Sequence, residues 1–318
     1  MGSVRFNPFA PGRVRRRIGV VALAVLGGLL ATALVLGGVP DPRRTAGPTP
    51  GGGEPGPPTV GPSSTAGAVL PADPPPLPAP PPPANLPVID YGPAPRGFPA
   101  DPDPMSTVRL DEGLRPIRRV AAYDAPGGRP RAWLAPTISG VPVTMPIVER
   151  RSGWVAVLLP SANRTIGWVP PGTWTTTALP DLVVVDRGGR RLHWYRDNRL
   201  VDSWPVSVGA GATPTPLGRT FILGRSSLPG RVYADTEVFA LGAVPDDPES
   251  VPTGLRGAHI GLHAWYRDAH LGRANSNGCV RITRRAQQRL LAELDPGTEL
   301  LVLDRFTAPA RLPGPPAV

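Results

Sequence analysis

The stretch H-I-G-L-H-A-W-Y-R-D-A-H-L-G-R-A-N-S-N-G-C-V-R-I spans His259–Ile282 and holds three of the four histidines and the only cysteine. A short apolar run, Ile260–Leu262, has the character of a strand and leads into His263. A polar, glycine-containing loop then brings the chain back to Cys279. Cysteine reacts as its thiolate, which requires a neighbouring base and a positive environment. The stretch therefore predicts a cysteine nucleophile with a histidine base, delivered by a β-rich fold.

The residues around Cys279 favour reactivity over a role as a small buried hydrophobe. Gly278 lets the backbone approach the sulfur closely, and Arg281 adds a positive charge two residues on. The chain after Cys279 leads towards a helix start, and we expect amide N–H groups there to stabilise a thiolate or an oxyanion. His263, at the strand end, can take the thiol proton and return it to a leaving amine. The alternative for His263 is a satisfied core histidine.

The histidines and the cysteine of this stretch could alternatively form a metal site. His259, His263 and Cys279 could together bind zinc, but no carboxylate or second cysteine stands at a convincing spacing. We therefore expect no metal and no cofactor. A single cysteine also excludes an intrachain disulfide.

The charge of the chain is strongly positive, at +10, and all 34 basic residues are arginine. These arginines are scattered and form no aromatic–basic stripe, which argues against nucleic-acid binding. A solvated surface close to an anionic cell envelope accounts for the charge better.

The N-terminal segment predicts a membrane anchor. Residues 1–17 carry five arginines and no acidic residue, and residues 18–39 carry no charge at all. An apolar run of this length crosses roughly 30 Å of hydrocarbon as a helix. The basic flank stays in the cytoplasm, so we expect a single-pass protein of the cell membrane with everything after residue 40 outside. A cleaved signal peptide is the alternative, although signal cores usually run to only about 7–15 residues.

Residues 40–104 are proline-rich and predict a disordered linker, because such a composition buries too little apolar surface to fold. From residue 105 to 179, short strand-like runs alternate with Gly/Pro turns, which indicates a small β-barrel. The runs Y-D-A-P-G-G (123–128), G-W-V-A-V-L-L-P (153–160) and I-G-W-V-P (166–170) resemble bacterial SH3-like domains. In actinobacterial wall enzymes such a module often precedes the catalytic domain.

Residues 180–305 form the second predicted domain, followed by a disordered tail at 306–318. Strands at 181–186 and 191–195 flank Gly188-Gly189 and predict a hairpin. A rigid T-P-T-P-L-G loop (213–218) precedes a further strand, and the irregular stretch 224–257 is a candidate lid or substrate wall. Thr283 is placed to cap a helix whose residues Ala286, Leu290, Leu291 and Leu294 fall on one face, before a last strand at 299–304.

Three motifs in this order resemble the L,D-transpeptidase catalytic domain, the YkuD fold, a β-sandwich. They are T-P-T-P-L-G (213–218), I-G-L-H (260–263) and S-N-G-C-V-R (276–281). The resemblance implies that Cys279 is the nucleophile and His263 the general base. It also implies that Ser276, Asn277 and Gly278 shape the loop and oxyanion region, and that Arg281 steadies the loop or meets a substrate carboxylate.

The chain departs from the family pattern at two places. Asn277 stands where the family usually has a histidine, and Ala264-Trp265 replaces the small, polar pair that usually follows the first histidine. Since asparagine also donates and accepts hydrogen bonds and His263 is kept, we expect activity.

By resemblance, the substrates are peptidoglycan stem peptides, joined by 3→3 cross-links through a cysteine acyl-enzyme outside the membrane. We expect a monomer. An L,D-carboxypeptidase and a non-catalytic wall-binding protein are the alternatives. A sortase would need a much longer separation between histidine and cysteine, and an NlpC-type hydrolase places its cysteine before its histidine.

Overall fold

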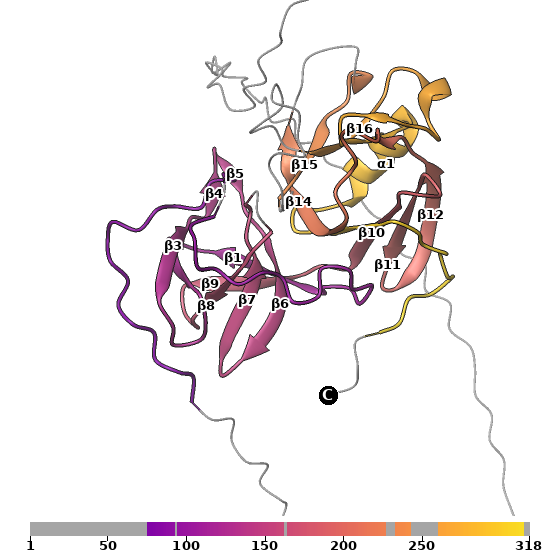
Figure 1. The fold of residues 1–318 in the computed structure, drawn as a ribbon. Helices are drawn as coiled ribbons and strands as arrows, with labels where there is room; N and C mark the ends of the chain where they lie inside the picture. Colours follow the sequence, from indigo (N-terminus) through magenta and orange to yellow (C-terminus); the bar gives the residue numbers. More distant parts are fainter. Residues whose placement is uncertain (1–74, 93, 162–163, 227–232, 243–259, 315–318) are drawn as a thin grey trace, which may run out of the picture. The chain divides into compact units, whose positions relative to one another are not determined.

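A computed structural model describes residues 75–92, 94–161, 164–226, 233–242 and 260–314 (Figure 1). All of these residues belong to one compact unit of the chain. Within it, two large β-sheets follow one another in sequence, two small two-stranded sheets accompany them, and the described residues contain a single α-helix. The expectation of a mainly β protein is confirmed.

The first sheet has seven strands in the order β3-β2-β8-β7-β6-β1-β9, and every pair in it is antiparallel. Its inward side chains are apolar and close-packed, with Trp154 wholly buried and its ring edge-on to Tyr123 at 5.0 Å. Short strands alternate with turns in this region, as the sequence predicts; the SH3-like character of this region stays a prediction. The elements are β1 (Glu112–Pro116), β2 (Val120–Tyr123), β3 (Pro130–Leu134), the small pair β4 (Thr137–Ile138) and β5 (Val141–Pro142), β6 (Met145–Arg151), β7 (Trp154–Leu158), β8 (Ile166–Val169) and β9 (Trp174–Ala178).

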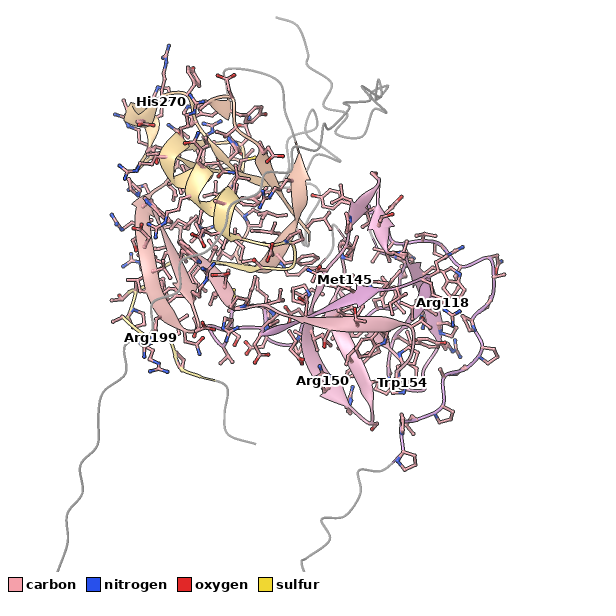
Figure 2. All side chains as sticks on the ribbon, turned by 180° about the vertical axis from the view of Figure 1, so that it is seen from behind. Arg118, Met145, Arg150, Trp154, Arg199 and His270 are labelled. Carbon is pink, nitrogen blue, oxygen red and sulfur yellow. The ribbon has the colours of Figure 1, made fainter. Side chains whose placement is uncertain are left out.

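The structured part of the chain begins earlier than the predicted boundary at residue 105. The indole N–H of Trp154, labelled in Figure 2, donates to the carbonyl of Leu77 at 2.7 Å, and the Tyr123 hydroxyl donates to the carbonyl of Pro80 at 2.7 Å. Ile89 and Phe98 are buried in the same apolar cluster as the first sheet. Aromatic donors of the sheet thus bind carbonyls of a proline-rich segment that composition alone assigns to a linker.

The second sheet has eight strands in the order β12-β11-β10-β19-β14-β15-β16-β18. Two of its pairs, β10 with β19 and β16 with β18, are parallel, and the others are antiparallel. The predicted hairpin and last strand are confirmed. The elements are β10 (Asp181–Asp186), β11 (Arg191–Arg196), β12 (Arg199–Pro205), β13 (Val208–Gly209), β14 (Gly218–Ser226), β15 (Val238–Leu241), β16 (Gly261–Ala264), a 3-10 turn (Asp268–His270), β17 (Ala274–Ser276), β18 (Val280–Ile282), α1 (Arg284–Glu293) and β19 (Glu299–Leu303).

The helix α1 lies beside β16 (Figure 1) and begins where the sequence predicts. The Thr283 side chain accepts a hydrogen bond from the Ala286 amide, as an N-cap should. Ala286 and Leu290 are buried among the apolar residues of the second sheet. Gln287, wholly buried, donates to the carbonyl oxygen of Leu262 at 3.4 Å and so ties the helix to β16.

The predicted disordered tail and the predicted membrane anchor lie at the two ends of the chain. Residues 306–312, expected to be disordered, pack on the sheet: Leu312 is buried, and the Tyr195 hydroxyl donates to the carbonyl of Pro309 at 3.0 Å. The predicted anchor at 18–39 lies outside the described residues. Among the residues that are described, none forms a helix of the length and apolarity needed to span a membrane.

Candidate active site

The site is built on the parallel pairing of β16 with β18. Leu262 pairs with Val280 and His263 with Arg281, so Cys279, one residue before β18, stands opposite Gly261. Side chains directly opposite one another, or two apart on a strand, lie on the same face of a sheet. Cys279, His263 and Arg281 therefore share one face, although 16 positions separate the cysteine from the histidine in sequence.

The Cys279 thiol is held in its neutral form at rest. Burial raises the pKa of this thiol, while a hydrogen bond from the Gly261 backbone N–H and the charge of Arg281 lower it. Burial is the largest of the three causes, because an ion is poorly solvated in the interior. The sulfur therefore needs a base before it can attack.

His263 has the protonation state that a base requires. Its Nδ1 lies 2.7 Å from the carbonyl oxygen of Ala264, which can only accept, so Nδ1 carries the proton. The ring is 3% exposed, and burial lowers its pKa to about 4 against the opposing effect of the Ala264 carbonyl. At pH 7 the ring is neutral, and Nε2 has the lone pair that can receive a proton.

Two aromatic rings lie close to His263. Tyr233 meets the imidazole edge-on with ring centroids 4.8 Å apart, and the Trp265 ring centroid lies 6.0 Å from that of the imidazole. The Arg281 guanidinium stacks on the Trp265 ring at 3.6 Å and donates to the Asn275 carbonyl at 3.1 Å. Trp265 thus holds the Arg281 guanidinium beside the thiol and the imidazole. Trp265 belongs to one of the two departures from the family pattern, and this contact gives it a role.

The loop before Cys279 is held by the T-P-T-P-L-G segment. Thr215 is 1% exposed; its hydroxyl accepts from the Gly209 amide at 2.9 Å and donates to the Gly278 carbonyl at 2.9 Å. Gly278 has a φ of +103°, a conformation that favours glycine. The Ser276 hydroxyl donates to the carbonyl of Cys279 at 2.5 Å. Two motifs distant in sequence therefore set the backbone that presents the sulfur.

The predicted site residues fall into three groups. Cys279, His263, Ser276, Gly278 and Arg281 come together as described. Asn277 belongs to the same loop but its side chain is exposed, whereas His259 lies outside the described residues. The expected helix N-terminus beside Cys279 is wrong: the chain forms β18 first, and α1 starts only at Arg284.

Other site residues were missed in the sequence. Tyr233 sits in the stretch proposed as a substrate wall, but nothing in its surroundings singled it out. Gly261 donates to the sulfur through its backbone, which no side-chain pattern reveals. In the part of the chain that the structure describes, no cluster of three or more histidine, cysteine or acidic residues could hold a metal ion.

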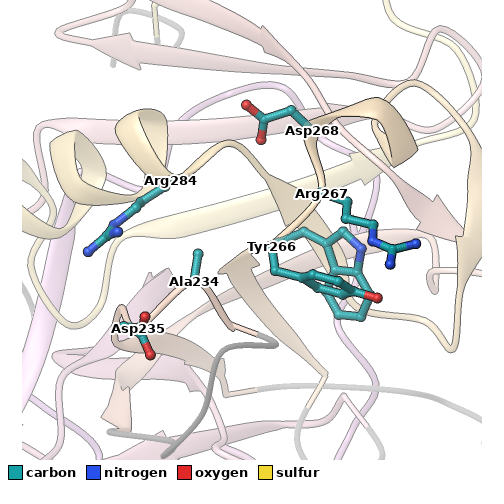
Figure 3. A pocket seen from close by; sticks show the side chains of 7 residues that line it. Ala234, Asp235, Tyr266, Arg267, Asp268 and Arg284 are labelled. Carbon is teal, nitrogen blue, oxygen red and sulfur yellow. The ribbon is translucent and has the colours of Figure 1, made fainter.

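An open cavity of about 1000 Å³ lies next to this site but does not include the thiol. Its lining is Ala234, Asp235, Trp265, Tyr266, Arg267, Asp268 and Arg284. Figure 3 shows Asp235 and Arg284 across the cavity from Tyr266 and Arg267. Because Trp265 also packs near His263, the cavity and the reactive face share a wall.

Comparison with known proteins finds relatives of the second domain. Residues 180–302 match the family model of the L,D-transpeptidase catalytic domain, YkuD. The YkuD protein of Bacillus licheniformis, named as a proposed L,D-transpeptidase, is 28% identical over 142 residues, which cover 45% of this chain and 76% of that protein. Its Bacillus subtilis counterpart is 25% identical over 134 residues, covering 42% and 73%. The resemblance of this domain to the YkuD family is thereby confirmed.

Solved structures give weaker likenesses. An L,D-transpeptidase from Mycobacterium smegmatis aligns with 15% identity and a TM-score of 0.32, covering 44% of this chain and 73% of that one. L,D-transpeptidase 3 from Mycobacterium tuberculosis aligns with 15% identity and a TM-score of 0.32, covering 44% and 75%.

Proposed function

We propose that this protein is a peptidoglycan L,D-transpeptidase that forms 3→3 cross-links between stem peptides through a Cys279 acyl-enzyme. One observation carries the proposal: the pairing of β16 with β18 sets Cys279, neutral His263 and Arg281 on a single face. A nucleophile, a base and a fixed positive charge on one face are what acyl transfer from an amide needs.

The first half-reaction makes a thioester. As the Cys279 sulfur attacks the carbonyl carbon of the third stem residue, the thiol proton passes to Nε2 of His263. The imidazolium then returns this proton to the nitrogen of the departing D-alanine when the C–N bond breaks. The hydrogen bond from Nδ1–H to the Ala264 carbonyl supports the transient positive charge on the ring.

The second half-reaction frees the enzyme. The side-chain amine of an acceptor stem attacks the thioester carbonyl and gives up a proton to His263. The C–S bond breaks, and the sulfur regains its proton from the imidazolium. Water in place of the amine would give an L,D-carboxypeptidase, which is the second candidate activity.

Arg281 has two duties in this scheme. Its charge lowers the pKa of the thiol and disfavours protonated His263. The nearby cavity carries both signs of charge: Arg267 and Arg284 can bind carboxylates of a stem peptide, and Asp235 and Asp268 can bind its amine. We therefore place one stem peptide along this cavity, with its reactive carbonyl at Cys279.

The cellular setting belongs to the same proposal. Residues 18–39 would anchor a monomer in the membrane, and the chain from residue 40 onward would work at the wall. The first sheet, as an SH3-like module of actinobacterial type, would contact the wall. If it did so without catalysis by Cys279, the protein would be the wall-binding alternative.

Purified disaccharide-tetrapeptide tests the activity. Incubation with the wild type should yield the tetrapeptide–tripeptide dimer with release of D-alanine, and Cys279→Ala should yield neither. Tripeptide monomer without dimer would instead assign the carboxypeptidase. If the wild type leaves the tetrapeptide unchanged, the result favours the non-catalytic wall-binding protein.

A further inference from the structure

Tyr91 lies in the segment before the first sheet and is held on both sides. Ahead of it, the Ile89 amide donates to the Trp133 carbonyl at 2.9 Å, and the Trp133 amide donates to the Pro87 carbonyl at 2.7 Å. Behind it, Asp101 forms a buried ion pair with Arg219, with two hydrogen bonds of 2.6 Å. A segment clamped in this way cannot swing freely, so the position of Tyr91 is part of the fold.

The Tyr91 hydroxyl and the Cys279 sulfur are bound by neighbouring amides of one strand start. The Ile260 N–H donates to the phenol oxygen, and the Gly261 N–H donates to the sulfur. A Cβ placed on Gly278 would lie 3.5 Å from Cδ1 of Ile260, so Ile260 also lies close to the loop that presents Cys279. Burial raises the pKa of Tyr91, and the interaction with Cys279 raises it further, which agrees with the closeness of the two groups.

The backbone of Tyr91 is strained. Its φ is +89°, a value that is a rare outlier for a bulky side chain and costs about 1–3 kcal/mol. Yet the side chain is only 8% exposed, turned inward rather than released to solvent. Strain of this kind persists where the surroundings fix a residue, and it gathers at functional sites.

We propose that Tyr91 is a specificity-determining residue of the active site, whose phenol covers one side of Cys279 and limits the width of the chains that reach the sulfur. The proposal rests on the proposed function only in naming a linear stem peptide as the chain admitted. Tyr233, packed against His263, bounds the site from a different segment. The segment before the first sheet is then part of the catalytic unit rather than a tether alone.

Thiol alkylation of the full chain, kept in mild detergent, tests this directly. Because Cys279 is the only cysteine, intact mass reports its reaction without ambiguity. A small reagent, iodoacetamide, is compared with a bulky one, fluorescein maleimide, and the readout is the ratio of the two rates. Tyr91→Ala should raise the bulky-to-small ratio by about tenfold, whereas Tyr91→Phe, which keeps the ring, should stay within about twofold of the wild type.

Phe98→Ala is the matched control, because Phe98 is an equally buried aromatic residue of the same segment. It should leave the ratio near that of the wild type. An unchanged ratio in Tyr91→Ala, or an equal rise in Phe98→Ala, would overturn the proposal. Should Tyr91→Ala fail to fold, Tyr91→Leu decides: a rise of about threefold supports the cover, and no rise refutes it.

This test separates the two proposals. Alkylation needs a reachable sulfur that can lose its proton but needs no peptidoglycan substrate, and the ratio of the two rates cancels the fraction of thiolate, so the test applies whether or not Cys279 serves a transpeptidase. If the tetrapeptide assay fails but Tyr91→Ala changes the alkylation ratio, the proposed function is wrong and the role of Tyr91 stands. If the tetrapeptide assay succeeds but the alkylation ratio does not change, only the role of Tyr91 is wrong.

Discussion

The buried pair of Asp101 and Arg219 makes a sharp prediction about where the folded unit begins. The two side chains are 1% and 4% exposed, and the Arg219 guanidinium donates two hydrogen bonds of 2.6 Å to the Asp101 carboxylate. Removing one partner of a buried pair leaves an uncompensated charge and typically costs 3–5 kcal/mol. Asp101→Ala should therefore lower the free energy of unfolding by about 4 kcal/mol, and the melting temperature by roughly 8–16 °C for a unit of this size.

Urea unfolding followed by tryptophan fluorescence measures this change. The double variant Asp101→Leu with Arg219→Met should recover most of the lost stability, since replacing both charges with apolar groups is often neutral. Glu112→Ala is the matched control, because its partner Arg150 is half exposed and exposed pairs contribute about 1 kcal/mol or less. A loss below about 1 kcal/mol in Asp101→Ala would show that residues before 105 do not belong to the folded unit.

Three further predictions concern the site and its support. Because the pKa of His263 is lowered to about 4, acylation of Cys279 by a carbapenem should proceed at a constant rate from pH 5 to 8 and slow only as pH drops through about 4. Stopped-flow acylation rates that halve near pH 6.5 would contradict this. Burial raises the pKa of Glu299 from 4.5 to about 7, so the folded state binds this proton more tightly than the unfolded state. Stability should therefore fall by up to about 3 kcal/mol as pH rises from about 4.5 to 7, and melting curves of Glu299→Gln should lack this slope. Thr215→Val leaves the Gly278 carbonyl without its hydrogen-bond donor, so it should lower the free energy of unfolding by about 1–3 kcal/mol and slow acylation. Thr213→Val loses one longer hydrogen bond of 3.3 Å and should lower both quantities less. Equal effects of the two variants would contradict a special role of Thr215.

Local pattern predicted much of this fold. Apolar alternation and Gly/Pro turns placed the strands, and Thr283 with its spaced apolar residues placed the helix. These features are short-range: they depend on residues within one or two turns of each other. The cysteine and histidine were found for the same reason, because a strand end and a returning loop lie in one stretch.

Composition failed where long-range partners decide the structure. A proline-rich segment appears disordered when only its own residues are weighed, but Asp101 finds Arg219 and Trp154 finds the Leu77 carbonyl far along the chain. Tyr91 reaches the Ile260 amide in the same way. No periodicity or motif in residues 75–104 announces these contacts, so the boundary was placed too late.

The sequence also misjudged what stabilises Cys279. Helix propensity after Thr283 suggested a helix N-terminus beside the sulfur, yet Val280–Ile282 pairs with β16 first. The strand amide of Gly261 and the charge of Arg281 take the place of the helix. Apolar β-branched residues directly after the cysteine were the available sign of this strand.

The most direct test of the central claim is the intact mass of the protein after incubation with a carbapenem, a strained amide that adds to an acylating nucleophile without losing a leaving group. We predict that the wild type gains the mass of one carbapenem and that Cys279→Ala gains none. No adduct on the wild type, or an equal adduct on Cys279→Ala, would contradict a Cys279 acyl-enzyme.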